Sequence, residues 1–316
     1  MDATAHRTTG KTLFAFAIIY LVWGSTYLAI RIGVREFPPF LLAALRFLIA
    51  GAVLYGWTIA RGERSPSRRQ WIRISLLAIL FFVLDYGLLF WAEQRVPSGI
   101  AAVLMASIPM FIALSEITLL RTQRITFRLA LALSAGIAGV AVLASRSRDF
   151  GGMPIDTRGV IALLVASISW ALGTALTKKL LLPFSHVMNS GSQMLAGGAL
   201  LALTSAALGE FHNFHPLHIS LGAWLSLLYL VVAGSIVAFT AYLWLIHHES
   251  PTKVGTYAFV NPVVAVLLGY FLVGEAIGRR TILGTALILV SVVAVTTGKE
   301  KRGAAIPVRG AAKAAG

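Results

Sequence analysis

The sequence predicts an all-α polytopic membrane protein with ten transmembrane helices arranged as two inverted five-helix repeats. Three features of the chain lead to this prediction. The chain is 58% hydrophobic and 12% charged, whereas a soluble domain carries about 25% charged residues. Apolar stretches long enough to cross about 30 Å of hydrocarbon recur along the whole chain. A pattern of tryptophan and proline occurs twice, which indicates an internal duplication.

The duplicated pattern sets the boundaries of the two repeats. Trp23, Trp71, Trp91 and Pro109 recur as Trp170, Trp224, Trp244 and Pro262, at an offset of 147 residues for the first pair and 153 for the others. We assign residues 12–145 to the first repeat and residues 158–297 to the second. Each repeat holds five spanning stretches, and an odd number forces the second repeat to enter the membrane from the opposite side. Inverted repeats are typical of transporters that bind substrate near the bilayer midplane.

Apolar stretches of about 20 residues justify the helices one by one. In the first repeat they cover 12–34, 38–60, 71–92, 97–119 and 126–145, and in the second 158–178, 184–208, 222–246, 252–273 and 280–297. Residues 1–11 form an N-terminal tail, and residues 298–316 form a basic tail that we expect to be disordered. No small-residue cleavage site follows the first stretch, so we expect no cleavable signal peptide.

The basic residues indicate how the helices are oriented. The net charge is +15, which in a soluble protein would suggest nucleic acid as a partner. With the N-terminus in the cytoplasm, 18 basic residues lie on the cytoplasmic side and 8 on the other, with Arg46 inside the membrane. This asymmetry follows the positive-inside rule and predicts that both termini are cytoplasmic. We therefore expect the basic loops to contact anionic membrane lipids and no nucleic acid.

Several kinds of chemistry are excluded or not expected. The absence of cysteine excludes disulfides and thiolate ligands. The chain lacks the phosphate-binding loop of ATP-driven proteins, and it lacks the His-Glu-x-x-His and Gly-x-Ser-x-Gly motifs of hydrolases. The one histidine cluster, His212, His215 and His218, is interrupted by Pro216 and is not expected to bind a metal. We expect no cofactor.

Specific residues resemble those of a known family. The stretch Trp-Gly-Ser-Thr-Tyr at residues 23–27, the paired half-repeats and the Gly274–Glu275 pair resemble the drug/metabolite transporter superfamily, and specifically an EamA-type transporter of the bacterial inner membrane. The resemblance implies that helices one to four and six to nine surround a central cavity and that helices five and ten are peripheral. It also implies export of small metabolites, amino acids or drugs. The first repeat departs from the pattern, because Arg121 and Thr122 stand where the second has Gly274 and Glu275.

Two ionisable residues within the apolar stretches are candidate binding groups, because a charge in hydrocarbon costs at least about 2.5 to 3.5 kcal/mol. Arg46 lies about 12 Å below the outer surface and Asp85 about 21 Å above the inner one, depths that agree within about 3 Å. We therefore predict an Arg46–Asp85 ion pair facing the cavity. It either binds substrate, with Asp85 taking an amine or a proton and Arg46 a carboxylate, or is purely structural. Gln193 replaces Arg46 in the second repeat, which makes the cavity asymmetric.

Aromatic and hydroxyl groups are the next candidates. Trp23, Ser25, Thr26 and Tyr27, with Trp170 in the second repeat, can line a binding pocket by stacking and hydrogen bonding. Alternatively, they pack helices together, as serine and threonine often do in membranes. Pro109 and Pro262 lie near the middle of helices four and nine, where they either act as paired gates or merely shape the bundle. Ser107 and Asn261 can satisfy the backbone groups that these prolines release, or alternatively contact substrate.

The predicted function is that of a secondary transporter, which moves small molecules by alternating access as the two repeats rock about the cavity. The alternatives are an intramembrane enzyme and a channel. In helix five, Gly136 and Gly139 follow Ala132 and Ala135 at four-residue spacing, which favours close helix contact, either within the chain or in a homodimer.

Overall fold

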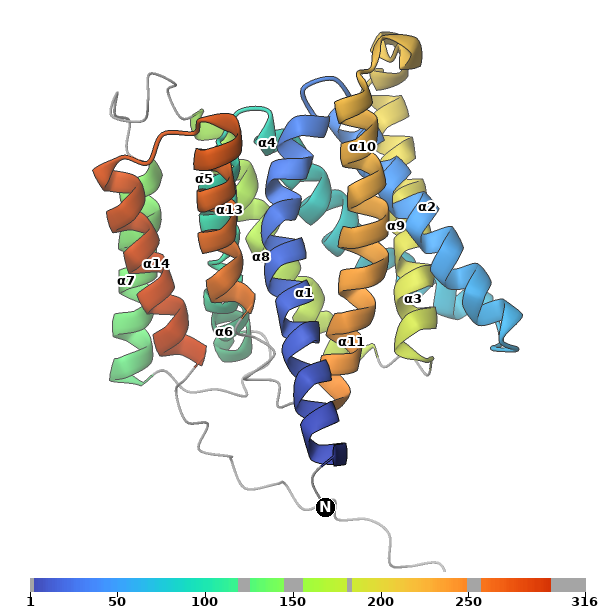
Figure 1. Ribbon diagram of the computed structural model, residues 1–316, viewed down its shortest axis with the longest axis horizontal. Coiled ribbons are helices and arrows are strands. Elements are labelled where there is room, and N and C mark those ends of the chain that lie inside the picture. Colours follow the sequence, from blue (N-terminus) through green and yellow to red (C-terminus); the bar gives the residue numbers. More distant parts are fainter. Residues whose placement is uncertain (1–2, 119–125, 145–155, 181–183, 249–256, 297–316) are drawn as a thin grey trace, which may run out of the picture.

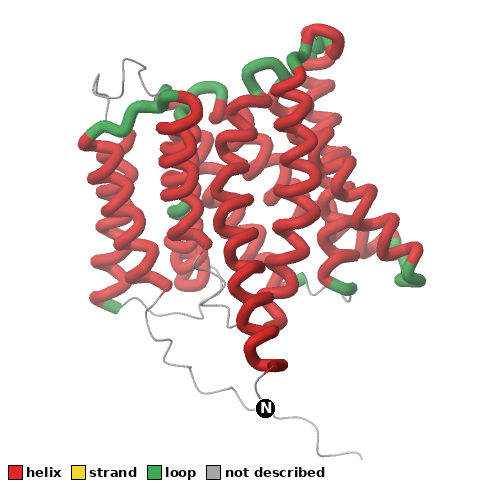
Figure 2. Tube along the Cα trace, in the orientation of Figure 1, coloured by secondary structure: helices red, strands yellow, loops and turns green. Residues whose placement is uncertain are grey.

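A computed structural model describes residues 3–118, 126–144, 156–180, 184–248 and 257–296. All regular secondary structure in these ranges is helical (Figure 2). Six of the described helical segments are long and apolar enough to cross a membrane, and two shorter apolar helices cover Phe127–Val142 and Val260–Val273. The prediction of an all-α polytopic membrane protein is confirmed. The tail at 298–316 lies outside the described residues.

The first half, up to residue 145, follows the predicted order. It contains α1 (Ala3–Gly33), α2 (Pro39–Ala60), a third segment of α3 (Arg68–Ala78), η1 (Ile79–Gly87) and α4 (Leu88–Glu93), a fourth of α5 (Ser98–Met105) and α6 (Ile108–Thr118), and α7 (Phe127–Ala144). Because α1 begins at Ala3, most of the predicted N-terminal tail continues the first helix. Elsewhere, the described helices begin and end within a few residues of the predicted stretches.

The second half begins at residue 157. It contains α8 (Thr157–Lys179), α9 (His186–Ala207), the short turns η2 (Glu210–Asn213) and η3 (Pro216–His218), an eighth segment of α10 (Leu221–Tyr229), η4 (Leu230–Val237) and α11 (Ala238–His248), then α13 (Tyr257–Val273) and α14 (Arg279–Thr296).

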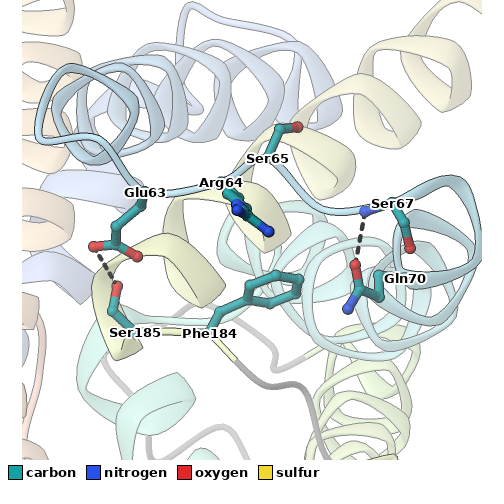
Figure 3. Close-up of a pocket in the computed structure, with 7 residues that line it drawn as sticks. All are labelled: Glu63, Arg64, Ser65, Ser67, Gln70, Phe184 and Ser185. Carbon is teal, nitrogen blue, oxygen red and sulfur yellow. Dashed lines mark hydrogen bonds between the residues drawn. The ribbon is translucent and has the colours of Figure 1, made fainter.

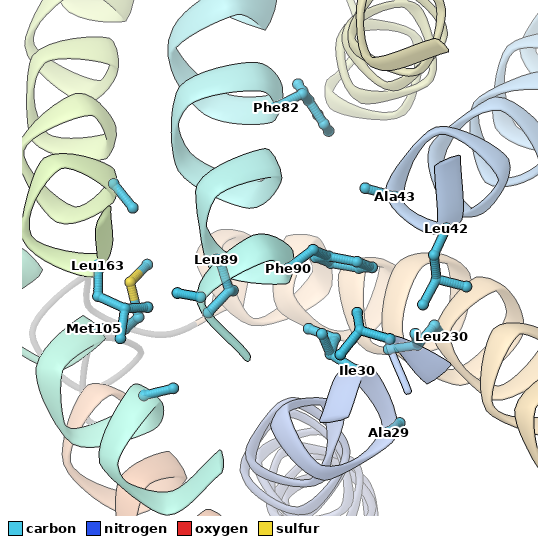
Figure 4. Packing of buried hydrophobic residues seen from close by; sticks show 14 of the residues in the cluster. Ala29, Ile30, Leu42, Ala43, Phe82, Leu89, Phe90, Met105, Leu163 and Leu230 are labelled. Atoms are coloured by element: carbon cyan, nitrogen blue, oxygen red, sulfur yellow. The ribbon is translucent and has the colours of Figure 1, made fainter. Parts of the chain in front are cut away.

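The two halves interlock rather than lying side by side. Helix α2 packs along α9, α1 lies against α11 and α13, and α8 lies against α6 and η1. Helices α7 and α14 pack together at one edge of the bundle (Figure 1). The buried apolar cluster includes Ile30 of α1, Leu42 of α2, Phe90 of α4 and Leu163 of α8 (Figure 4). The core of the protein is therefore the interface between the halves.

Glycines let the backbones of α2 and α9 approach closely. A Cβ atom at Gly51 would lie 2.7 Å from the backbone nitrogen of Leu195, and one at Gly191 would lie 2.6 Å from that of Tyr55. Apolar area drives little association between helices in a bilayer, so close van der Waals contact between small residues must hold them together. The α2–α9 contact therefore depends on these glycines.

The small residues of α7 also make contacts within the chain. A Cβ atom at Gly139 would lie 2.8 Å from the Ile288 side chain and 2.9 Å from the carbonyl oxygen of Gly284, both on α14. Of the two uses considered for this stripe, the structure shows packing inside the chain.

Two π-helical segments occupy matching places in the halves. The segments η1 and η4 lie in the middle of the third and eighth segments, and such bulges disturb the regular ladder of backbone hydrogen bonds. Leu80 of η1 accepts a 2.8 Å bond from Ser169 Oγ, and Gly234 of η4 accepts a 3.1 Å bond from Trp23 Nε1. Each π segment is thus bonded by the first helix of the other half, as hydrocarbon surroundings require.

Three glutamates join the halves at the distal end of the bundle, which we define as the end opposite the N-terminus (Figure 1). Glu36 accepts bonds of 2.6 Å from both the backbone nitrogen and the hydroxyl of Ser220, at the start of α10. Glu210 accepts a 2.9 Å bond from the backbone nitrogen of Leu41, in the first turn of α2. Carboxylates are favourable at helix N-termini, where backbone N–H groups lack partners.

The third glutamate is Glu275, which the sequence singled out without a role. Its Oε1 accepts 2.8 Å bonds from the nitrogen and the hydroxyl of Ser98, and its Oε2 accepts a 3.1 Å bond from the nitrogen of Gly99. Gly274 has a φ of +70°, a conformation that favours glycine. The resulting turn places the Glu275 carboxylate on the first turn of α5, so that the second half caps a helix of the first.

Replacing Gly51 by Ala should destabilise the protein, because the new methyl would meet backbone atoms of α9 that cannot move aside. Overpacking of this kind costs about 1 to 3 kcal/mol. Gly56→Ala is the matched control on the same helix, since a Cβ there meets nothing within 4 Å. Thermal unfolding in detergent should show a lower Tm for Gly51→Ala only. Equal values for the two variants would contradict the packing role.

Glu36 should make stability depend on pH. The Ser220 hydroxyl and backbone N–H, which both donate to the Glu36 carboxylate, lower the pKa of Glu36. Its stabilising effect is complete above the ordinary glutamate pKa of about 4.3 and is lost as the pH falls through the lower folded value. The native protein should therefore have a higher Tm than Glu36→Gln at neutral pH, with the difference shrinking in acid. A difference that does not change with pH would refute this linkage.

Candidate functional site

A buried cation lies where the halves meet. Arg46 of α2 is 2% exposed, and its Nε donates a 2.9 Å hydrogen bond to Ser235 Oγ of η4. Its Nη1 has no hydrogen-bond partner within the described part of the chain. A buried guanidinium with an unused donor is costly in hydrocarbon and is a strong candidate for binding an anionic group.

Aromatic rings surround the guanidinium. Its central carbon lies 4.8 Å from the ring centroid of Phe47, 5.2 Å from that of Tyr86 and 6.0 Å from that of Phe90. Attraction between a cation and the face of a ring contributes about 2 kcal/mol or more when both are desolvated. These rings therefore offset part of the cost of burying Arg46 while leaving its Nη1 available.

The predicted Arg46–Asp85 ion pair is wrong. Asp85 is 1% exposed on η1, but the only ion pair within the described ranges joins Arg95 to Asp156 at 3.7 Å. Equal depth in the membrane does not fix the direction in which a side chain points. Successive residues of a helix point about 100° apart, and it is the neighbouring Tyr86 whose ring lies under Arg46. The π-helical winding of η1 could not be anticipated from depth.

Asp85 nevertheless belongs to the same polar cluster. Its Oδ1 is buried without a hydrogen-bond partner in the described structure. The phenol of Tyr27 on α1 interacts electrostatically with both Asp85 and Tyr86, and Tyr86 does so with Arg46. We define the central cluster as Tyr27, Arg46, Asp85, Tyr86 and Ser235. It draws on α1, α2 and η1 of the first half and on η4 of the second.

The other residues of the 23–27 stretch bond mainly within helices and between them. Trp23 lies with its ring centroid 5.0 Å from that of Tyr257 and 5.2 Å from that of Tyr242. Thr26 donates a 2.6 Å bond to the Trp23 carbonyl. Ser25 Oγ donates to the Val22 carbonyl at 2.8 Å and lies 2.6 Å from the Tyr229 hydroxyl oxygen. These contacts match the helix-packing interpretation, and only Tyr27 of this stretch is in the central cluster.

Of the two candidates in the second repeat, one lies beside the central cluster and the other bonds within its own helix. Trp170 lies edge-on to Phe81 and Tyr86, with ring centroids 4.9 Å and 6.1 Å apart, so it borders the central cluster. Gln193 donates a 2.8 Å bond to Asn189 on its own helix. The structure therefore brings Trp170 to the cluster and gives Gln193 a local partner.

The two prolines differ in their effect on the helix. Pro109 follows a break between α5 and α6, where Ser107 Oγ donates a 2.6 Å bond to the Leu104 carbonyl. Pro262 lies inside the continuous helix α13. With its amide nitrogen turned toward them, Asn261 donates to the carbonyls of Tyr257 and Tyr20, 3.2 Å and 3.3 Å away. A proline in a helix releases the carbonyl four residues before it, whereas Leu104 and Tyr257 lie five residues before Pro109 and Pro262. These bonds therefore do not satisfy the released carbonyls, and that role stays a prediction.

Two residues of interest were missed by sequence reasoning. Ser235, the partner of Arg46, is one serine among many in apolar stretches. Glu93 is fully buried, although it follows the third predicted stretch by one residue. Its acidic side chain at the edge of an apolar stretch was the only available signal.

A separate pocket of about 350 Å³ opens at the other end of the bundle, between the connection after α2 and the residues before α9 (Figure 3). It is lined by Glu63, Arg64, Ser65, Ser67, Gln70, Phe184 and Ser185. Ser185 Oγ donates a 2.9 Å bond to Glu63 Oε1. None of the predicted site residues lines it.

Comparison with known proteins identifies the family. The pattern of the EamA-like transporter family matches twice, at residues 10–145 and 157–297. The chain is 38% identical over 287 residues to the uncharacterized inner membrane transporter YedA of Escherichia coli K12, covering 90% of each chain. It is 28% identical over 278 residues to the protein PecM of Dickeya dadantii, covering 87% of this chain and 88% of PecM.

A solved crystal structure supports the fold. It matches with a TM-score of 0.60 at 24% identity, covering 91% of this chain and 96% of the other. Two copies of one family pattern, together spanning nearly all of the described helices, agree with the duplication seen in the sequence. This multi-pass membrane protein belongs to the EamA-like transporter family.

Proposed function

We propose that the protein is a secondary transporter that moves small metabolites bearing a carboxylate, such as amino acids, out of the cell across the inner membrane. The observation that carries this proposal is the buried Arg46, whose Nη1 has no partner among the described residues. Arginine presents paired donors that match the two oxygens of a carboxylate. An amine on the same molecule would suit Asp85, whose Oδ1 also lacks a partner there.

We infer that transport proceeds by alternating access between two inverted repeats around a central cavity. The helices of one half pack mainly on helices of the other, so that relative movement of the halves would change the surroundings of the central cluster. The positive-inside rule places the distal end outside the cell and both termini in the cytoplasm. Pro109 and Pro262, beside the break in helix four and inside α13, are suitable places for the helices to bend.

Two further roles follow for the remaining candidates. Trp23, Ser25, Thr26 and Trp170 shape the wall of the cavity through the contacts described above, and Gln193 supplies a neutral group on α9. Membrane lipids surround the bundle, and the exposed apolar side chains leave room for a homodimer. An intramembrane enzyme and a channel remain the alternatives, and the relatives named above offer no support for either, since YedA is named a transporter.

Replacing Arg46 by Gln should strongly reduce transport of carboxylate substrates. Hydrogen bonds to charged groups contribute about 1.5 to 3 kcal/mol, which corresponds to about a ten- to hundredfold loss of apparent affinity. Uptake and counterflow of labelled amino acids in proteoliposomes measure this effect. Arg35→Gln, at an exposed position near the distal end, is the matched control and should transport normally.

The same assay separates the alternatives. Saturable counterflow identifies a carrier, flux that does not saturate identifies a channel, and chemical conversion of the added compound identifies an enzyme. Unchanged carboxylate transport by Arg46→Gln would exclude the assigned binding role.

Asp85→Asn should abolish transport of zwitterionic substrates while leaving membrane insertion normal, because it removes the negative charge and preserves the shape of the side chain. Metabolite profiles of medium and cytoplasm from cells expressing each variant provide the measurement. Asp156→Asn is the control, since Asp156 caps α8 and asparagine caps helices about as well. Transport kinetics of Asp85→Asn equal to those of the native protein would rule Asp85 out.

A further inference from the structure

Glu93 differs from the other described glutamates at the distal end. Glu36, Glu210 and Glu275 each accept hydrogen bonds from a helix N-terminus. Glu93, the last residue of α4, is 0% exposed, and neither oxygen of its carboxyl group has a hydrogen-bond partner within the described structure. The Glu93 carboxyl group is therefore shielded from water, and no hydrogen-bond donor in the described structure replaces the water.

The nearest cation does not supply that donor. Arg31 of α1 donates a hydrogen bond from Nη1 to the backbone carbonyl of Glu93, and the two side chains form no ion pair within the described ranges. Arg95, two residues further along the chain, pairs with Asp156 and stacks 3.7 Å from the ring centroid of Trp91. Both cations close to Glu93 in the chain or in space are thus engaged with other groups.

The groups that act on Glu93 electrostatically come from three places. Glu275, in the α13–α14 connection, is a like charge, and Arg31 on α1 is an opposite one. The Tyr27 phenol interacts with Glu93 and also with Asp85 nearer the middle of the bundle. The neighbouring parts of α2, α5 and α8 contribute buried apolar residues of the core cluster, among them Ala43, Ile100 and Val160.

This environment suits a neutral acid. An ionised carboxylate without a donor would bear a large desolvation cost, and the like charge of Glu275 would add to it. A protonated carboxyl avoids both penalties. The packing of the distal end seen here therefore matches the protonated side chain.

We propose that Glu93 binds a proton from the outer solution when the distal end closes and releases it when this end opens. The step forms one O–H bond on the carboxylate from a proton delivered by water, and needs no other reactant. Ionised Glu93 would repel Glu275 and attract Arg31, which weakens the cap that Glu275 places on Ser98 and Gly99. Closure of the distal end is thereby coupled to proton uptake, so that, resting on the proposed function, the pH of the outer solution regulates the closing step of the transport cycle.

The distance across the distal end tests this proposal without any substrate. The chain has no cysteine, so cysteines introduced at Leu217 and Ala276, both exposed, carry two unique spin labels. Double electron–electron resonance in lipid nanodiscs, from about pH 4 to about pH 9, measures their separation. We expect the native protein to lengthen this distance by about 5 Å or more as the pH rises, and Glu93→Gln to keep the short distance throughout.

Two further variants complete the experiment. Glu63→Gln makes the same substitution at the opposite end and should respond to pH like the native protein. Glu93→Asp retains a carboxyl group and should retain the response with a displaced midpoint, which tests the proposal even if Glu93→Gln inserts poorly. The proposal fails if the native distance is independent of pH, if Glu93→Gln responds like the native protein, or if Glu93→Asp loses the response.

The distance readout separates this proposal from the transport function. A pH response that depends on Glu93, in a protein that moves no carboxylate compound in proteoliposomes, would support proton binding and contradict the proposed function. Carboxylate transport by a protein whose label distance does not change with pH would support the proposed function and contradict proton binding by Glu93.

Discussion

Close backbone contact between helices of opposite halves is the constraint on which this structure depends. Lipid tails are as apolar as leucine, so burying apolar area drives association only weakly and contact at short range must replace it. The glycines of α2 and α9 provide that contact at Gly51 and Gly191, and α7 meets α14 at Gly139 in the same way. Because these pairs cross between halves, the buried apolar core draws on both of them, and the second half supplies Ser235, the hydrogen-bond partner of Arg46, to the central cluster.

The need to give every backbone carbonyl a hydrogen-bond donor explains why polar side chains lie at the centre of the interface between the halves. A π segment interrupts the helix ladder in each half, and its carbonyls at Leu80 and Gly234 accept bonds from Ser169 and Trp23. In water such groups would be solvated, whereas in hydrocarbon only another part of the chain can satisfy them. Tyr86 and Asp85 both lie in the π segment of the first half, where the Tyr86 ring contacts Arg46 and Asp85 forms no ion pair with it.

Charged side chains make different contacts at the centre of the bundle and at its distal end. At the centre, Arg46 is surrounded by rings and bonded to one hydroxyl, and its Nη1 has no hydrogen-bond partner in the described structure. At the distal end, glutamates cap helices of the opposite half, and their bonds hold the halves together at a surface where water can reach them. Glu93, also at the distal end, interacts electrostatically with Tyr27 of the central cluster and with Glu275.

Composition and periodic hydrophobicity by themselves determined the all-α membrane fold, the helix order and the approximate helix ends, because each spanning helix must be apolar over its whole length. The repeated tryptophans and prolines also indicated the duplication, and rarity in an apolar stretch singled out Arg46 and Asp85. Only the tertiary structure decided that these two do not pair, that Ser235 contacts Arg46, and that Glu93 is buried. Those facts depend on how each helix is rotated and on where its ladder bulges. Contacts between distant segments set both, and no local pattern in the sequence encodes them.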